Sequence, residues 1–341
     1  MASHVQRLSV LDVSPVPSGT TPTQALANSV DIACLTDALG YTRYWLAEHH
    51  NTAGIASSSP EVMIAHIATQ TDQIRVGSGG IMLPNHSALK VAETFKVLEA
   101  LHPGRIDLGI GRAPGTDAKT ALALRRSPEV LRTDTFPAQL GELLAFLGDG
   151  IPEGHPLHGV TAVPRDGAAP ELWMLGSSGY GAHVAAQLGM GFAFAHHINP
   201  AMAIQALRTY RDSFEPSDAV PEPAPIVAVA VVCGETEDEA ERLAATVDLV
   251  WLRIGQGRTG LPVPSLEEAL AYEYSPAEEA QRQANRQRFW IGTADTVSSR
   301  LDELARITGA PEVMVLTTVH DHESRRRSYE LLAKAFDLSA S

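Results

Sequence analysis

The sequence predicts an α/β fold, specifically a (β/α)8 TIM barrel with inserted loops. Short aliphatic runs alternate eight times with longer helical patterns over the 341 residues of the chain. This alternation is typical of parallel α/β folds, and closed eight-stranded barrels take roughly 200 to over 400 residues. Polar residues and glycines recur just after the aliphatic runs, where such barrels have their functional face. A doubly wound open sheet is the alternative that the same alternation allows.

Eight apolar segments are expected to form the strands. Each is rich in aliphatic side chains and is followed by glycine, proline or polar residues, which end a strand. In chain order they are Leu8–Val13, Tyr44–Ala47, Ile74–Leu83, Ile106–Ile110, Glu171–Leu175, Phe192–Ala195, Ile226–Cys233 and Glu312–Thr318.

The segments between these strands have the spacing of amphipathic helices. Two of them carry clear boundary signals: Gly40 follows the first helix, and Pro60 stands in a first turn, where its missing N–H costs little. The expected helices are Gln24–Leu39, Pro60–Thr71, Ala88–Leu101, Thr133–Leu147, Ala182–Leu188, Ala201–Phe214, Thr236–Leu252 and Ser324–Phe336.

Two segments rich in glycine and proline interrupt this alternation. Gly148–Pro170 is predicted to be an inserted loop. Gly255–Pro276 is predicted to be a mobile lid, because a long irregular loop in a compact domain is usually an active-site lid or a mobile insertion. No internal repeat and no boundary is evident, so residues 1–341 are expected to form a single barrel domain.

Composition excludes several classes of protein. The chain has 40 acidic and 26 basic residues and a formal net charge of −14, which argues against nucleic-acid or anionic-membrane partners. The longest apolar run, Ala224–Cys233, is shorter than the ~20 residues that span a bilayer. Met1–Val16 has no apolar core of secretory length, so a cytoplasmic location is expected. Cys34 and Cys233 give no disulfide framework.

Two sequence features indicate an anion site. Gly176–Gly181 joins a strand to a helix with small residues, so backbone N–H groups at the helix N-terminus and the hydroxyls of Ser177 and Ser178 can cradle a phosphate. The alternative is an ordinary turn that caps the helix. Arg112 follows Gly109–Gly111, whose spacing is not that of a nicotinamide-binding fingerprint. Its guanidinium suits a phosphate or carboxylate, and a surface salt bridge is the alternative.

Histidines follow several of the predicted strands. His49 comes after the second strand and is a candidate general acid/base, although a strand-end histidine is more often a hydrogen-bonding pocket residue. His196 and His197 follow the sixth strand. His320 and His322 follow the eighth at a spacing of two, which places them on one face and weakly suggests a metal. No third ligand has matching spacing, so no metal is expected.

Four segments with characteristic motifs follow one another along the chain: Tyr44–His50, Ile74–Leu89, Gly104–Arg112 and Leu175–Ser178. In this order they resemble segments of the bacterial luciferase-like flavin-dependent monooxygenases, and more narrowly of their small luciferase-like oxidoreductases. The similarity extends from about Leu8 to the C-terminal helix.

This resemblance implies a barrel that binds FMN, with the reduced form and O2 as cosubstrates. A flavin C4a-peroxide would then oxygenate a small organic substrate, with reduced flavin usually supplied by a separate flavin reductase. By position, His49 matches the catalytic histidine, and Gly79–Gly80 matches a non-proline cis peptide beneath the isoalloxazine. The resemblance also implies a homodimer. The implied cofactor-binding residues are Gly79, Gly80, Arg112, Gly176, Ser177, Ser178 and Gly179.

Three alternatives remain open at the level of the sequence. Related barrels bind the deazaflavin F420 at the same place, so an F420-dependent oxidoreductase is the first alternative, with FMN favoured. A non-catalytic flavin-binding barrel is the second. A metal-dependent barrel hydrolase that uses His320 and His322 is the third. The sequence does not name the organic substrate.

Overall fold

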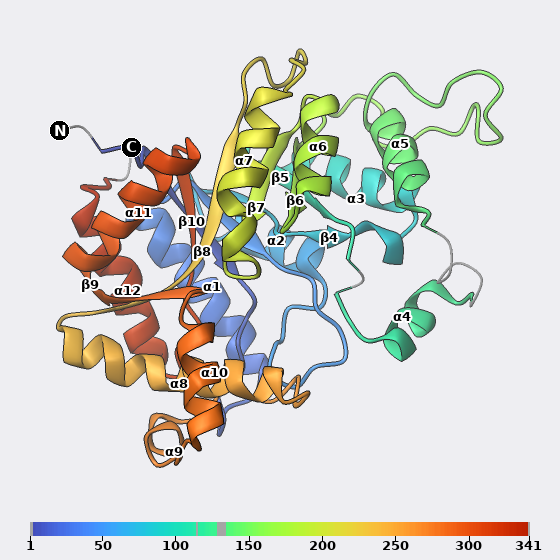
Figure 1. The fold of residues 1–341 in the computed structure, drawn as a ribbon. Coiled ribbons are helices and arrows are strands. Elements are labelled where there is room, and N and C mark those ends of the chain that lie inside the picture. Colours follow the sequence, from blue (N-terminus) through green and yellow to red (C-terminus); the bar gives the residue numbers. More distant parts are fainter. Residues whose placement is uncertain (1–2, 114, 128–133, 340–341) are drawn as a thin grey trace.

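The computed structural model describes residues 3–113, 115–127 and 134–339, and within them eight parallel strands close into a barrel (Figure 1). Strand β10 pairs with both β1 and β8, which closes the circle. The predicted (β/α)8 TIM barrel is therefore confirmed, and the open-sheet alternative is wrong. The barrel strands are β1 (Arg7–Asp12), β2 (Arg43–Leu46), β3 (Arg75–Ser78), β5 (Ile106–Gly111), β6 (Glu171–Gly176), β7 (Gly191–Ala195), β8 (Pro225–Gly234) and β10 (Glu312–Leu316).

The third predicted strand is interrupted, so the expectation of one strand over Ile74–Leu83 is wrong. After β3 the chain passes through Gly79 and Gly80, forms the two-residue strand β4 (Ile81–Met82) and continues in the 3₁₀ helix η1 (Leu83–Asn85). The Gly79–Gly80 peptide bond is cis, the geometry that the resemblance implied there. A Cβ atom on Gly80 would lie 2.6 Å from the carbonyl oxygen of Gly109, so the backbone of β5 leaves room for glycine alone.

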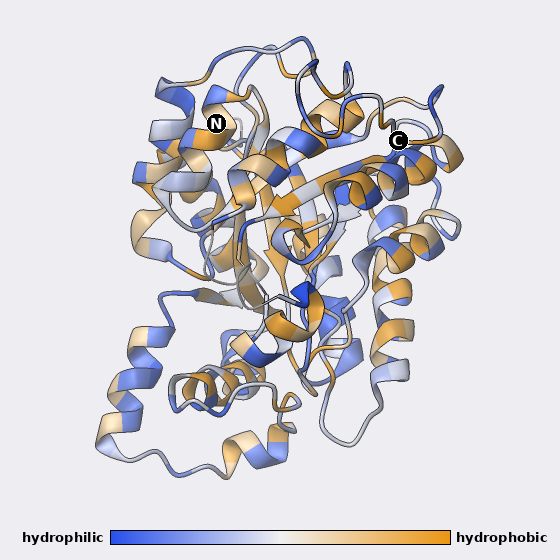
Figure 2. Cartoon of the chain, turned by 90° about the vertical axis from the view of Figure 1, so that its right-hand side faces the viewer, coloured by the Kyte–Doolittle hydropathy of each residue, from blue (hydrophilic) through white to orange (hydrophobic). Residues whose placement is uncertain are grey.

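Helices surround the barrel, and Figure 2 shows apolar residues concentrated in the central strands, with polar and apolar residues alternating along the outer helices. The side chain of Thr21 caps the first of them by accepting from the backbone of Gln24. None of the described helices is long and apolar enough to cross a membrane. Thr133, the predicted start of one helix, lies outside the described residues. The helices that correspond to the predicted ones are α1 (Pro22–Ala38), α2 (Pro60–Ala68), α3 (Ala88–Leu101), α5 (Phe136–Leu147), α6 (Gly179–Gln187), α7 (Ala203–Asp212), α8 (Glu237–Gly255) and α12 (His322–Ala335).

Several elements were not predicted. Strand β9 pairs with the second half of β8, residues 230–234, whereas β10 pairs with residues 226–230. Ala230 pairs with both Leu316 and Phe289, so β9 and β10 flank β8 on opposite sides. The unpredicted elements are α4 (Ala118–Arg125), α9 (Leu266–Leu270), α10 (Pro276–Asn285), β9 (Phe289–Thr293) and α11 (Ala294–Thr308).

The two interrupting segments lie at opposite ends of the barrel. Residues 148–170 contain neither helix nor strand and lead into the start of β6. Figure 1 shows this loop, in green, on the opposite side of the barrel from α8, α9 and α10. The segment Gly255–Pro276 contains α9, so it is not the fully irregular loop that the sequence suggested.

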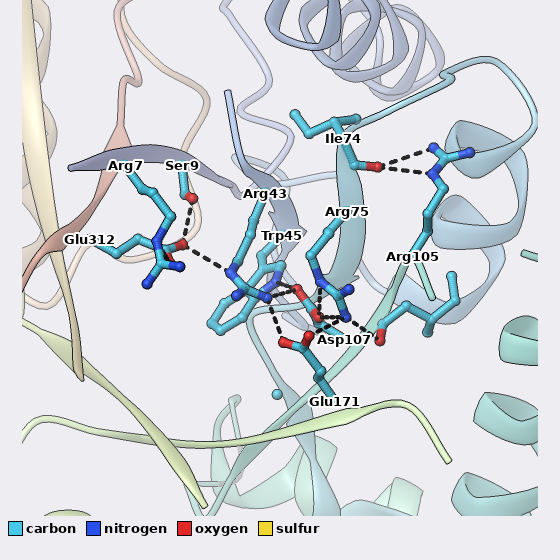
Figure 3. Close-up of polar contacts among 12 residues, drawn as sticks. Arg7, Ser9, Arg43, Trp45, Ile74, Arg75, Arg105, Asp107, Glu171 and Glu312 are labelled. Atoms are coloured by element: carbon cyan, nitrogen blue, oxygen red, sulfur yellow. Dashed lines mark hydrogen bonds and ion pairs between the residues drawn. The ribbon is translucent and has the colours of Figure 1, made fainter. Parts of the chain in front are cut away.

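Charged residues fill the barrel at the N-terminal ends of its strands (Figure 3). Arg43 donates to Asp107 at 2.8 Å, to Glu312 at 2.9 Å and to Glu171 at 3.0 Å. Asp107 also accepts from Arg75 at 2.6 Å. These side chains come from different strands, so their contacts tie the strands together by charge. We call the following set the ionic layer: Arg7, Ser9, Arg43, Trp45, Arg75, Asp107, Glu171 and Glu312.

Trp45 connects the ionic layer to the apolar interior of the barrel. Its indole N–H donates to Asp107 at 2.8 Å, while its ring lies 5.5 Å from the ring of Trp173. Both tryptophans belong to an apolar cluster inside the strands, together with Met314 and Leu316. The interior of the barrel is therefore packed, and open space begins only above this cluster.

Candidate active site at the C-terminal ends of the strands

A cavity of about 770 Å³ opens at the C-terminal ends of the barrel strands. The ends of β1, β2, β5, β6, β7 and β10 all contribute to its wall, through Leu11, Trp45, Gly111, Gly176, Ala195 and Leu316. This is the end at which TIM barrels place their functional residues, and the volume lies in the range of small-molecule sites.

Most of the residues singled out from the sequence meet in this cavity. Those that line it are His49, Gly79, Arg112, Gly176, Ser177 and Ser178. Gly80 and Gly179 do not line the cavity, although each is next to a residue that does. The structure thus brings together six of the eight residues, while the role of each stays a prediction. Pro114, in the segment after the fourth predicted strand, lies outside the described residues.

His49 presents a free ring nitrogen in this cavity. Its backbone N–H donates to the carbonyl oxygen of Ser57 at 2.9 Å, which fixes the chain after β2. Its Nδ1 atom is buried and has no hydrogen-bond partner within the described residues. Burial lowers the pKa of His49, although the charge of Glu48 opposes the shift. A neutral imidazole with an unused nitrogen can bond to a ligand or take up a proton.

Glu48 directs its carboxylate away from His49. It accepts from the Nε2 atoms of His50 at 2.8 Å and His86 at 2.9 Å, and from the backbone N–H of Met82 at 2.8 Å. Burial alone would raise the pKa of Glu48, but the bonds from His86, His50 and Met82 outweigh it and lower the pKa. The Glu48 carboxylate therefore links the loop after β2, which carries His49, to the segment from Met82 to His86, which follows the cis peptide.

The N-terminus of α6 faces the cavity without a capping side chain. Ser178 stands at the N-cap, but its side chain makes no cap hydrogen bond. Gly176 and Gly181 lie side by side, and a Cβ on Gly176 would make an ordinary contact with the Cα of Gly181 at 3.5 Å. Uncapped N–H groups at a helix N-terminus attract anions, so the local geometry suits a phosphate.

Arg112 lies beside this helix start. The centre of its guanidinium is 4.2 Å from the ring centroid of Tyr180, in the first turn of α6. Its Nη2 donates to Asp134 at 2.6 Å, and both side chains are about half exposed. Arg112 thus makes the surface salt bridge that was one interpretation of it, and it also lines the cavity, where the other interpretation places an anion.

His197 also lines the cavity, although no role was predicted for it from the sequence. It is buried, and its Nδ1 donates to the carbonyl oxygen of Ala228 at 3.1 Å. Burial lowers the pKa of His197 to about 4, and the nearby His49 acts in the same direction. Its position directly after the sixth predicted strand was the signal that pointed to it.

A segment after α8 covers the mouth of the cavity. Val263 accepts from the backbone of Ser18 at 2.8 Å and donates to that of Val16 at 2.9 Å, which attaches this segment to the loop after β1. Arg253, Arg258, Leu261 and Val263 all line the cavity. We call residues 256–263 the roof; it is the first part of the predicted lid, and its mobility stays a prediction.

The two histidines after β10 do not form a metal site. His320 donates to the carbonyl oxygen of Ser18 at 3.0 Å, and His322 contacts Asp31 at 2.7 Å. Neither lines the cavity. Within the described part of the chain, no three histidine, cysteine or acidic side chains are placed to hold a metal ion. The hydrolase alternative therefore has no ligand set among these residues.

A closed barrel with a deep cavity at the C-terminal ends of its strands defines the chain as a TIM-barrel protein of the kind that carries enzymatic sites. Comparison with known proteins identifies which kind. The chain belongs to the luciferase-like monooxygenase family, whose model matches residues 7–310.

Curated relatives and solved structures agree with this membership. The chain is 40% identical to the luciferase-like monooxygenase of Escherichia coli K12, over 97% of both chains. It is 34% identical to the N-acetyl-S-alkylcysteine monooxygenase of Bacillus subtilis, over 96% of this chain and 98% of that protein. The crystal structure of apo-MsnO8 superposes with a TM-score of 0.90 at 42% identity, over 98% of this chain and 99% of that one.

Two more distant structures share only the fold. One is the oxygenating constituent of 3,6-diketocamphane monooxygenase of Pseudomonas putida in complex with FMN, with a TM-score of 0.72 and 20% identity over 98% of each chain. The other is an F420-dependent secondary alcohol dehydrogenase, with a TM-score of 0.66 and 11% identity over 98% of this chain and 99% of that one. Of these two proteins, one is bound to FMN and the other is named for F420.

Proposed function

We propose that this protein is an FMN-dependent monooxygenase that uses reduced FMN and O2 to oxygenate a small organic substrate. The observation that carries the proposal is the uncapped N-terminus of α6 in the cavity, with Arg112 beside its first turn. Family membership supports a monooxygenase. The FMN-bound structure with the same barrel supports FMN as the cofactor.

The residues present fit this group. One end of the cavity offers N–H groups, hydroxyls and a guanidinium for a phosphate. The rest of the cavity wall is largely apolar, as a flavin ring system requires, and includes Leu11, Trp45, Met174 and Leu175. The unpartnered Nδ1 of His49 supplies a polar contact for the ring edge.

Bound reduced FMN would supply the electrons that activate O2. Ser177, Ser178 and Arg112 would hold its phosphate, and the backbone at Gly79–Gly80 would support the ring. His49, neutral because burial lowers its pKa, would hold or move a proton at Nδ1. The roof would exclude water from the reacting groups. A homodimer and a separate flavin reductase belong to the proposal through the family resemblance.

Binding and turnover test this proposal separately. Purified protein is titrated with FMN, riboflavin and F420, and reduced FMN is then mixed with O2 and candidate substrates. FMN should bind at least tenfold more tightly than riboflavin, because riboflavin lacks the phosphate. N-acetyl-S-alkylcysteines are the first substrates to assay, since a relative is named for them.

Each rival has its own outcome in these assays. Tight binding of F420 with no measurable FMN binding would favour the F420-dependent alternative. FMN binding without oxygenation of any substrate tested would favour a non-catalytic flavin-binding barrel.

A further inference from the structure

The charged side chains that line the cavity are positive, whereas the chain as a whole has a negative net charge. The chain carries a formal net charge of −14. Among the described residues, however, no aspartate or glutamate lines the cavity, whereas Arg112, Arg253 and Arg258 do. Low-dielectric walls lined by one sign of charge focus the field and concentrate ligands of the opposite sign. The charges on the cavity wall therefore favour anions, and the wall holds more cationic groups than one flavin phosphate needs.

Arg253 and Arg258 form a pair at the roof. Arg253 lies in the last turn of α8, and its carbonyl oxygen accepts from the backbone N–H of Arg258 at 2.9 Å. The Arg253 side chain is only 13% exposed and bonds through Nη2 to Glu268. Its Nε is buried without a partner in the described structure. A buried donor left unsatisfied is costly, and a ligand that accepts from it removes that cost.

Arg258 is the more available member of this pair. Arg258 is exposed, and its guanidinium makes no hydrogen bond or ion pair with the residues that the structure describes. It therefore has no carboxylate partner to release before it binds an anion. Arg112 and Arg253 differ in this respect, because they are bonded to Asp134 and Glu268.

This pair belongs to a different part of the cavity from the phosphate cradle. Arg112 follows β5 and stacks on Tyr180 of α6, whereas Arg253 and Arg258 come from the end of α8 and the roof. The side chains near them in the sequence that also line the cavity are apolar: Trp251, Ile254, Leu261 and Pro262. A ligand held there meets two guanidinium groups and an apolar surface.

We propose that Arg253 and Arg258 form a second anion subsite, and that the organic substrate is a small carboxylate with an apolar body. The forked guanidinium matches a planar carboxylate, and two arginines give it two sets of donors. The apolar body lies against the roof and the end of α8. The inference rests on the proposed function in one respect, because FMN occupies the Arg112 end of the cavity.

Equilibrium binding of a matched pair of probes tests this subsite without any turnover. Octanoate and its neutral analogue octanamide are titrated by calorimetry into the full chain saturated with FMN. Octanoate should bind at least tenfold more tightly, and Arg258→Gln should remove about tenfold of its affinity without changing that of octanamide. Arg253→Gln should act in the same direction. Arg242→Gln is the control, because it removes the same charge from an exposed position of α8 that does not line the cavity.

The outcomes separate this inference from the proposed function. Equal affinities for octanoate and octanamide, or equal effects of Arg258→Gln and Arg242→Gln, would overturn the subsite. A selective loss of FMN affinity over riboflavin in Arg258→Gln would also overturn it, because the arginine would then serve the flavin phosphate. If FMN does not bind at all, the proposed function fails, while arginine-dependent octanoate binding to the free protein would still support the subsite.

Discussion

Replacement of Arg112 by alanine should weaken FMN binding by about 5- to 30-fold and leave riboflavin binding almost unchanged. A charge-assisted contact with a phosphate contributes ~1.5–3 kcal/mol. Arg112 is already bonded to Asp134, however, and both side chains are about half exposed. Exposed ion pairs of this kind contribute ~0.2–1 kcal/mol, and this is lost when the arginine turns to the ligand. The net gain is about 1–2 kcal/mol, which corresponds to the stated factor at ~1.4 kcal/mol per tenfold change.

Asp134→Asn provides the reciprocal variant. It frees the Arg112 guanidinium without removing it, so FMN should bind up to about fivefold more tightly, while Arg112→Ala should have a larger effect in this background. The assay is a titration of flavin fluorescence with each variant, using FMN and riboflavin in parallel. The reasoning is refuted if Arg112→Ala weakens both flavins equally, or if FMN affinity stays within twofold of the parent.

Four further experiments test other parts of the structure. Asp107→Asn should lower the free energy of unfolding by ~3–5 kcal/mol, because it breaks buried ion pairs. Glu171→Gln should lower it by less than ~1 kcal/mol, because the Glu171 side chain is 49% exposed. Equal urea midpoints for the two variants would contradict this. His49→Ala should weaken FMN binding only slightly, through the lost contact with the ring edge, and should keep the melting temperature, but it should slow oxygenation by ~10²–10⁴-fold. An unchanged rate would assign the role elsewhere. His197 has a pKa of about 4, below the ~6.5 of an unfolded chain, so its stabilisation is present above pH 6.5 and lost as the pH falls towards 4. His197→Gln should reduce this fall in the free energy of unfolding with falling pH. Parallel curves of the free energy of unfolding against pH for the variant and the parent would contradict the prediction. Amides of residues 256–263 should exchange hydrogen more slowly with FMN and octanoate bound, and identical exchange would contradict a lid.

The barrel was predictable because its strands are buried on both faces and therefore appear as apolar runs. β8 shows this most clearly, since every one of its residues is buried. The break after β3 is marked in the sequence by Gly79 and Gly80, but the aliphatic residues on either side favoured one continuous strand. What fixes the break is the close approach of Gly80 to Gly109 of another strand, which the sequence does not show. β9 was missed because only Phe289, Trp290 and Ile291 mark it, after a polar helix that does not resemble a barrel unit.

The site was predictable where position alone decides it. His49, Ser177 and Ser178 follow strands, and a barrel brings such residues to one mouth. Arg253 and Arg258 could not be placed in this way, because neither follows a strand. Arg253 lies in the last turn of α8, and Arg258 lies in the roof, which bonds to the loop after β1. Contacts of that kind join distant parts of the chain and leave no periodic pattern.

The ionic layer matters for engineering the protein to accept new substrates. Its charges hold the beginnings of the strands, at the far end from the cavity, so closure of the barrel does not depend on the shape of the mouth. Trp45 is the residue that belongs to both ends and should be kept. Libraries that randomise Trp251, Ile254 and Leu261 should then yield folded variants with new selectivity, which makes this chain a scaffold for directed evolution.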